Sequence, residues 1–243
     1  MKKFVILISC TMLCCFACKT NSKKEKENEY KEEREVRDPV YIKDNSQKIP
    51  TTVEAIAQIN GIQHWHKVKE IKFTYNIDQD SSHYERSWKW KPKNDMVTLT
   101  SEKDTITYYR TQLDSTTTKI DHKFINDKYW LLAPLHLVWD TKNFTSEHKV
   151  KAVAPISNTE MQKLTIVYNN DSGYTPGDAY DFYFKGDFII KEWVFRKKNQ
   201  STPSITTSWE DYQSFNGLKI AKKHKQKEGN RTLYFTEIEV IME

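Results

Sequence analysis

Two histidines that flank a tryptophan are the first residues that could do chemistry: His64 and His66, in "QHWHK". In an extended strand, side chains two positions apart point to the same face. Both imidazoles could then bind one metal ion, such as zinc. A third ligand would have to come from scattered histidines, namely His83, His122, His136, His148 and His224. Surface histidines beside a buried tryptophan are the simpler interpretation, and we predict no metal site.

A pair of carboxylates, Asp178 and Asp181 in "TPGDAYD", could in principle act as general acid and base. Asp178 directly follows Pro176-Gly177, so shaping a turn explains it better. The patterns GxSxG, HExxH, GxxxxGK[ST] and GxGxxG are absent, and the chain has only 6 glycines. The sequence therefore predicts a non-catalytic protein that uses no cofactor and no nucleotide, with a hydrolase of dispersed site residues as a third possibility.

The stretch "YWLLAPLHLVWD", residues 129–140, is the most apolar part of the chain after its N-terminus. Its roughly eleven apolar positions are fewer than the ~20 that cross a membrane. We expect a helix with Asn126 or Asp127 as its N-cap, ending near Asp140, and with a kink or a second short helix at Pro134. Apolar side chains surround it on nearly every side, so the helix should be buried.

Period-two alternation predicts about ten strands, from "EIKFTYNI" at residues 70–77 to "RTLYFTEIEVI" at residues 231–241. Their short polar turns favour antiparallel neighbours. Before them, "TTVEAIAQING" predicts a helix capped by Thr51 or Thr52 and stopped at Gly61. We therefore expect a mainly β fold. Its single curved antiparallel sheet would form an unclosed half-barrel of about ten strands, with an N-terminal helix and a mid-chain apolar lid helix.

A lid helix over a curved sheet could enclose an apolar ligand site. The candidate residues on the lid are Trp130, Leu131, Leu135 and Trp139, and those on the sheet are Phe73, Tyr75, Trp88 and Trp90. Two interpretations stay open. Either these side chains line a cavity that binds a hydrophobic molecule, or they form a packed core with no cavity.

The N-terminus has a basic start, an apolar core and a small residue before Cys18, which is the form of a secretory signal peptide. It resembles a bacterial lipoprotein leader in which Cys18 carries the lipid. Cys10 in "LISC" fits the residue pattern better but leaves too short an apolar region. An ordinary cleaved signal or an N-terminal anchor is the other alternative. All 4 cysteines lie at or before position 18, so a chain that begins at Cys18 has no disulfide.

We expect three segments: a signal peptide over 1–17, a charged flexible tether over 18–50, and one folded domain over 51–243. Loss of two lysines with the signal peptide lowers the formal net charge from +5 to +3, which argues against nucleic-acid binding. The later lysines fall on strands and turns. They form a solvated face or meet anionic lipid headgroups: Lys191, Lys197, Lys198, Lys222, Lys223, Lys225 and Lys227.

Four stretches in this order resemble the LolA/LolB superfamily of outer-membrane lipoprotein carriers and receptors, in a poorly characterised bacterial lipoprotein branch. They are "IAQINGIQHWHKVKEIKFTY", "NDKYWLLAPLHLVWD", "GYTPGDAYDFYF" and "SWEDYQSFNGLKIAKKH". The resemblance covers roughly residues 53–241. It implies an unclosed barrel whose helices cover an apolar cavity that holds acyl chains, although the family's functional residues do not map onto this chain one by one.

Together these observations predict a lipid-anchored outer-membrane protein that faces the periplasm or the cell surface. It would bind or hand over an acyl chain, a lipid or a lipoprotein. The alternative is a structural or interaction lipoprotein whose packed barrel docks a protein partner.

Overall fold

The computed structural model describes residues 49–101 and 104–243. These residues belong to one compact unit that begins at Lys48. The expected signal peptide, Cys18 and the expected tether up to residue 48 lie outside the described residues. In the part of the chain that is described, no helix is both long enough and apolar enough to cross a membrane.

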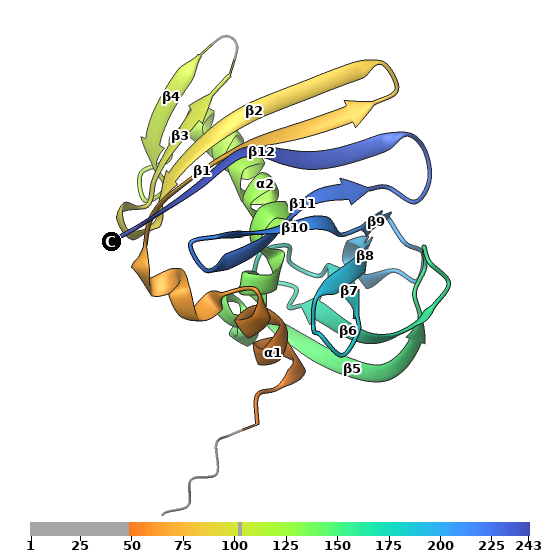
Figure 1. The fold of residues 1–243 in the computed structure, drawn as a ribbon. Helices are drawn as coiled ribbons and strands as arrows, with labels where there is room; N and C mark the ends of the chain where they lie inside the picture. The colour runs from red at the N-terminus through yellow and green to blue at the C-terminus, as the bar shows by residue number, and fades with distance from the viewer. Residues whose placement is uncertain (1–48, 102–103) are drawn as a thin grey trace, which may run out of the picture. The chain divides into compact units, whose positions relative to one another are not determined.

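Two antiparallel, unclosed sheets make up most of the fold (Figure 1). The seven-stranded sheet contains, in spatial order, β10 (Glu210–Phe215), β11 (Leu218–Lys225), β12 (Arg231–Met242), β1 (Val68–Gln79), β2 (Ser82–Lys91), β3 (Met96–Thr100) and β4 (Thr105–Tyr109). The five-stranded sheet contains β5 (Phe144–Val153), β6 (Glu160–Tyr168), β7 (Ala179–Phe184), β8 (Ile190–Arg196) and β9 (Ile205–Ser208). The mainly β, antiparallel, open architecture is confirmed.

The two sheets meet where β9 runs into β10, with only Trp209 between them. The Trp209 N–H donates to the carbonyl of Lys191 at 2.8 Å, so the chain stays against β8 as it bends. An isolated bridge joins Thr207 to Gln226 just beyond β11. One strongly bent strand therefore crosses from one sheet to the other, and the expected single curved sheet is divided at this bend.

The strand count is twelve instead of about ten for two local reasons. The predicted strand "ITTSWEDY" is split into β9 and β10 by the bend. The strand β5 was missed because its sequence, "FTSEHKVKAV", does not alternate: seven consecutive residues after Phe144 are exposed. A strand at the sheet edge that buries neither face gives no period-two signal.

The N-terminal helix forms as expected: α1 spans Thr52–Ile59. Thr51 and Glu54 make a capping box, with the Glu54 N–H donating to the Thr51 hydroxyl at 3.2 Å. Gly61 has φ of +94°, and a Cβ there would lie 2.1 Å from the carbonyl oxygen of Gly217. This close approach and the left-handed backbone both require glycine. Short 3₁₀ turns follow at η1 (Ile62–Lys67), η2 (Pro92–Asn94), η3 (Thr141–Asn143) and η4 (Lys197–Asn199).

The mid-chain helix begins earlier than expected: α2 spans Ser115–Trp139. Its N-cap is Asp114, which accepts from the N–H groups of Thr116 and Thr117 at 2.9 and 2.7 Å. The expected cap at Asn126 or Asp127 is wrong, because these residues lie inside the helix. The expected kink is present, since Leu132 leaves the helical region two residues before Pro134.

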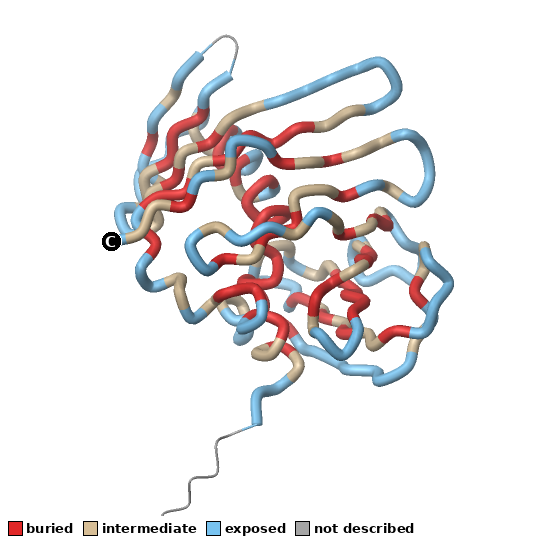
Figure 2. Tube along the Cα trace, viewed as in Figure 1, coloured by how far each residue is buried: buried red, intermediate tan, exposed pale blue. Residues whose placement is uncertain are grey.

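The core lies between α2 and the inner faces of both sheets, and Figure 2 shows the buried residues following this helix and the strands beside it. One continuous apolar cluster includes residues from α1, α2 and both sheets. The helix is therefore enclosed on nearly all sides over residues 127–137, as its apolar surroundings predicted.

Candidate functional site

Two ion pairs fix the first half of α2 to the seven-stranded sheet. Asp127 is fully buried and pairs with Arg86 of β2, whose Nη2 lies 2.5 Å from Oδ1. The indole N–H of Trp88 donates to the same carboxylate at 2.8 Å. One turn and a half earlier, Asp121 accepts from Nε of Arg110 at 2.8 Å. A buried ion pair with additional hydrogen bonds holds its two elements in one register.

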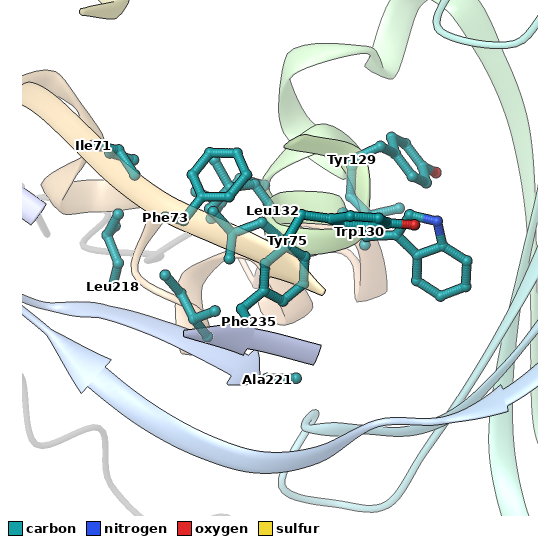
Figure 3. Close-up of a cluster of buried hydrophobic side chains, with 14 of the residues drawn as sticks. Ile71, Phe73, Tyr75, Tyr129, Trp130, Leu132, Leu218, Ala221 and Phe235 are labelled. Atoms are coloured by element: carbon teal, nitrogen blue, oxygen red, sulfur yellow. The ribbon is translucent and has the colours of Figure 1, made fainter. Parts of the chain in front are cut away.

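Trp130 comes next on the buried side of α2. Its ring stacks on that of Trp193 from β8, with centroids 4.4 Å apart and planes 15° apart. Figure 3 shows that Trp130 lies beside Tyr75 of β1, in a cluster that also includes Phe73 and Leu132. Trp130 therefore contacts both sheets, through Trp193 of β8 and His224 of β11.

Two small pockets lie at Trp130, and Asn126, Trp130 and Ile205 line both of them. The first, which we call the polar pocket, has a volume of about 100 Å³ and is also lined by Tyr75, Thr207, His224, Gln226, Arg231 and Leu233. The second, the aromatic pocket, has a volume of about 110 Å³ and is also lined by Tyr129, Tyr174, Thr175, Tyr180, Trp193 and Phe195.

The polar pocket contains buried groups with unused hydrogen-bonding capacity. His224 is completely buried; among the described residues no side chain makes a hydrogen bond with either ring nitrogen, and only the Ser208 backbone interacts with the ring. The hydroxyl of Thr207 also has no partner. Burial lowers the pKa of His224 to about 3, against a smaller opposite effect of the Ser208 backbone, so the imidazole is neutral at physiological pH.

The aromatic pocket is formed by rings that contact one another. Tyr129 and Tyr174 stack in parallel, with centroids 4.1 Å apart. Tyr180 meets Trp193 edge to face at 5.3 Å. Burial raises the pKa of the Tyr129 hydroxyl well above its usual value, so the hydroxyl stays protonated. Apolar ring faces with a few neutral hydroxyls are suited to an apolar chain.

The eight predicted site residues are brought to the same core, but they do not line a common cavity. Trp130 lines both pockets and Tyr75 lines the polar pocket. Phe73 and Trp88 pack in the core on the inner side of the seven-stranded sheet. The remaining four lie in the same apolar cluster and line neither pocket: Trp90, Leu131, Leu135 and Trp139.

The sequence reasoning missed His224, Thr207 and Arg231 as pocket residues. A signal for His224 was present, because period two from Leu218 and Ile220 places it on the apolar face of β11. Thr207 and Arg231 gave no such signal, since each reaches the pocket through pairing between β9, β11 and β12.

Near the other end of the core, Lys128 lies among aromatic rings. Its Nζ is 5.2 Å from the ring centroid of Trp90 and 6.0 Å from those of Phe124 and Trp139. Trp65 of η1 completes this cluster, 4.6 Å from Trp139. Burial lowers the pKa of Lys128 to about 8, although the surrounding π systems favour the cation.

The last turn of α2 carries a buried histidine and carboxylate. Nδ1 of His136 is 2.8 Å from Asp140 Oδ2, which also accepts from the Tyr168 hydroxyl at 2.9 Å. Burial lowers the pKa of His136 to about 4, and its Nε2 has no partner. These contacts connect the end of α2 to β6.

The residues first considered for metal or acid–base chemistry have other surroundings. His64 and His66 lie on η1, a 3₁₀ turn, so the extended geometry that would place both imidazoles on one face is wrong. Within residues 49–101 and 104–243, no three His, Cys, Asp or Glu side chains are grouped to hold a metal. Asp178 accepts from the Lys198 N–H at 2.8 Å, and Asp181 pairs with Arg196 at 3.0 Å.

A larger hollow of about 400 Å³ lies on the outer face of the seven-stranded sheet. Residues 72–74 of β1 and 87–89 of β2 line it, and these include the predicted site residues Phe73 and Trp88. It is an open surface groove and shares no lining residue with the two pockets at Trp130.

No family model matches the chain, and no curated protein matches it. Among solved structures, it is similar to a DUF1329 family protein from Desulfovibrio piger, with 8% identity over 78% of this chain and 91% of that chain and a TM-score of 0.45. It is also similar to a LolA superfamily protein from Nitrosomonas europaea, with 8% identity over 79% of this chain and 94% of that chain and a TM-score of 0.47. The LolA superfamily is the one that the four sequence stretches resemble. At such identities the likeness concerns the path of the chain and gives no information about the side chains at Trp130.

Proposed function

We propose that the domain binds an apolar chain, such as the acyl chain of a lipid or lipoprotein, in the space beside Trp130 between α2 and the sheets. The observation that carries this proposal is the pair of pockets that Trp130 separates. They share three lining residues, so a rotation of the Trp130 side chain would join them into one elongated space. The role is binding or handing over, without catalysis.

The two pockets are smaller than a typical ligand-binding site. Their volumes of about 100 and 110 Å³ are below the 300–1,000 Å³ that is typical of small-molecule sites. For the proposed binding, the conformation described would be a closed one, in which Trp130 fills the middle of the binding space. Its indole stacks on Trp193 and is still 8% exposed, so solvent already reaches the side chain that would move.

The test is native mass spectrometry of the full chain released from detergent micelles. A bound lipid adds a few hundred daltons that disappear on denaturation, and the lipid is then identified in an organic extract. Trp130→Ala should increase the bound fraction by joining the pockets, and Ile205→Trp should abolish it by filling both. Circular dichroism must show that both variants are folded.

A chain that carries no lipid in the wild type or in Trp130→Ala, and that takes up no added fatty acid, would contradict the proposal. It would favour the alternative in which the barrel is a filled core that docks a protein partner.

We also propose that Cys18 carries a lipid anchor and holds the domain at the outer membrane, facing the periplasm or the cell surface. The supporting observation is the leader-like sequence that ends at Cys18. Metabolic labelling with palmitate should label the wild type and Cys10→Ala but not Cys18→Ala. Membrane fractionation of the same cells tests the location. Label that is retained in Cys18→Ala and lost in Cys10→Ala would place the anchor at the earlier cysteine.

A further inference from the structure

The polar pocket holds two buried side chains whose hydrogen-bonding capacity the described residues do not fully use. The Thr207 hydroxyl has no partner among them, and the His224 ring has no side-chain partner and only a backbone interaction with Ser208. Both residues line the same pocket. Buried polar groups in folded proteins nearly always have a partner. A group that enters the pocket would supply it.

The residues that line the polar pocket indicate the charge of the ligand group that it would bind. Arg231 lines the pocket, is half-buried, and forms no ion pair with any of the described residues. No aspartate or glutamate lines the pocket. The buried carboxylate of Asp127, which follows the lining residue Asn126, is already bound by Arg86 and Trp88. The pocket therefore offers one uncompensated positive charge and several neutral donors, which favours an anion.

The neutral donors come from different elements and converge on the same space. A neutral imidazole has one N–H donor and one acceptor, and a threonine hydroxyl can donate or accept. The amides of Asn126 and Gln226 line the pocket as well. Within residues 49–101 and 104–243, the Asn126 side-chain amide donates to Asp127 at 3.1 Å, whereas the Gln226 side-chain amide makes no hydrogen bond.

The volume limits the ligand to a small head group and a single chain. About 100 Å³ accommodates a carboxylate and its first carbons, and the aromatic pocket of about 110 Å³ lies on the other side of Trp130. A lipid with three chains would need far more room than both together. A planar carboxylate also matches the fork of an arginine guanidinium.

We propose that the polar pocket binds the carboxylate of a single-chain amphiphile, a free fatty acid, through Arg231, His224 and Thr207, while its chain passes Trp130 into the aromatic pocket. This inference rests on the proposed function and names its ligand class. The head group is recognised by residues of β9, β11 and β12, and the chain by residues of α2, β7 and β8.

The test uses photo-crosslinking in the cell fraction that carries the full chain. The probes are a diazirine-bearing palmitic acid, its methyl ester, and a lysophosphatidic acid with the same chain. Crosslinks are mapped to peptides by mass spectrometry. Peptides around Trp130 and residues 205–231 should carry the acid at least about tenfold more than the ester, because a charge-assisted hydrogen bond is lost in the ester.

Variants test recognition of the head group separately from recognition of the chain. Arg231→Gln should lower labelling by the acid to the level of the ester and leave the ester unchanged, whereas Lys123→Gln, an exposed control on α2, should change neither. His224→Leu should lose the preference for the acid and gain resistance to protease on heating, because it removes a buried imidazole whose hydrogen-bonding capacity is not fully used. A histidine with a purely structural role would make the protein less resistant when replaced. His122→Leu, at an exposed position, is the control.

No labelling by any probe at these peptides would overturn both this inference and the proposed function. Equal labelling by acid and ester, unaffected by Arg231→Gln, would keep the proposed function and overturn the carboxylate site. Preferential labelling by the lysophosphatidic acid would replace the carboxylate with a phosphate head group.

Discussion

Replacement of Lys128 by methionine should stabilise the protein, although it removes a positive charge that lies over the ring of Trp90. Lys128 is 8% exposed, and its pKa is lowered from 10.5 to about 8, chiefly by burial and also by Arg110. Asp140, Asp121 and Asp95 oppose this shift without cancelling it. At pH 7 the folded protein therefore holds a buried ammonium that the unfolded chain would hold in water.

The size of the effect follows from the shift. A lowering of about 2.5 pKa units corresponds to about 3 kcal/mol of unfolding free energy. Methionine also gives up cation–π attraction to Trp90 and its neighbours, worth roughly 0.5–2 kcal/mol. The net gain at pH 7 should be about 1–3 kcal/mol, which raises the melting temperature by roughly 2–12 °C in a domain of this size.

The pH dependence provides the sharper test. Between about pH 8 and 10.5 the unfolded state binds a proton that the folded state has released, so the stability of the wild type rises with pH in this window. Below pH 8 the penalty is present in full. Urea unfolding followed by circular dichroism at pH 7 to 10 should show the advantage of Lys128→Met shrinking as the pH rises.

The exposed residue on the same helix gives the control: Lys123→Met should show neither the gain nor the pH dependence. A Lys128→Met variant that is less stable than the wild type at pH 7 would refute the reasoning. It would mean that attraction to the rings exceeds the cost of burial.

Four further predictions concern single contacts. Asp127→Asn leaves a buried guanidinium without its counter-charge and should cost about 3–5 kcal/mol in urea unfolding, with little change in a double variant that also makes the arginine apolar. Asp114→Ala removes the cap of α2 and should lower the unfolding free energy by about 1 kcal/mol, whereas Asp114→Asn should nearly preserve it. Gly61→Ala forces a Cβ to within 2.1 Å of a backbone oxygen and should prevent stable folding or lower the melting temperature sharply; an unchanged melting curve would show that the turn yields. Burial lowers the pKa of His136 and His224 to about 4 and 3, so unfolding free energy should fall as the pH drops below 6.5, by at most about 2.7 kcal/mol per pH unit. His136→Phe should roughly halve that slope, and a slope unchanged by this substitution would assign the acid sensitivity elsewhere.

The parts of the fold that were predictable are those whose burial has a local period. In "IKFTYNI" of β1 the residue types alternate between apolar and polar, although Thr74 and Asn76 are buried as well. The helix α1 carries its cap, its apolar positions and its stop within eleven residues. The start of α2 was missed for the opposite reason. Its first turns, "STTTKIDHK", have few apolar residues, and the cap at Asp114 was overlooked in favour of polar residues that stand closer to the apolar run.

The pocket was less predictable than the fold because its polar residues are apart in sequence. Trp130, Tyr75 and their neighbours were expected from apolar character alone, and the core did bring them together. Arg231 opens β12, and Thr207 belongs to β9. Only the bend at Trp209, with the bridge from Thr207 to Gln226, brings these strands to one pocket.

The polar residues of α2 also indicate how its binding space would open. Asp121 and Asp127 look like solvent-facing residues in the sequence, yet both are buried and paired with arginines outside the helix. To move the helix away from the seven-stranded sheet would separate both ion pairs and the hydrogen bonds that accompany them. Rotation of Trp130 would give up its stack on Trp193, worth roughly 0.5–1.5 kcal/mol beyond burial, and leave both ion pairs intact. A ligand would therefore enter by displacing this side chain from a helix that stays in place, and this is why the Trp130→Ala variant is the decisive one.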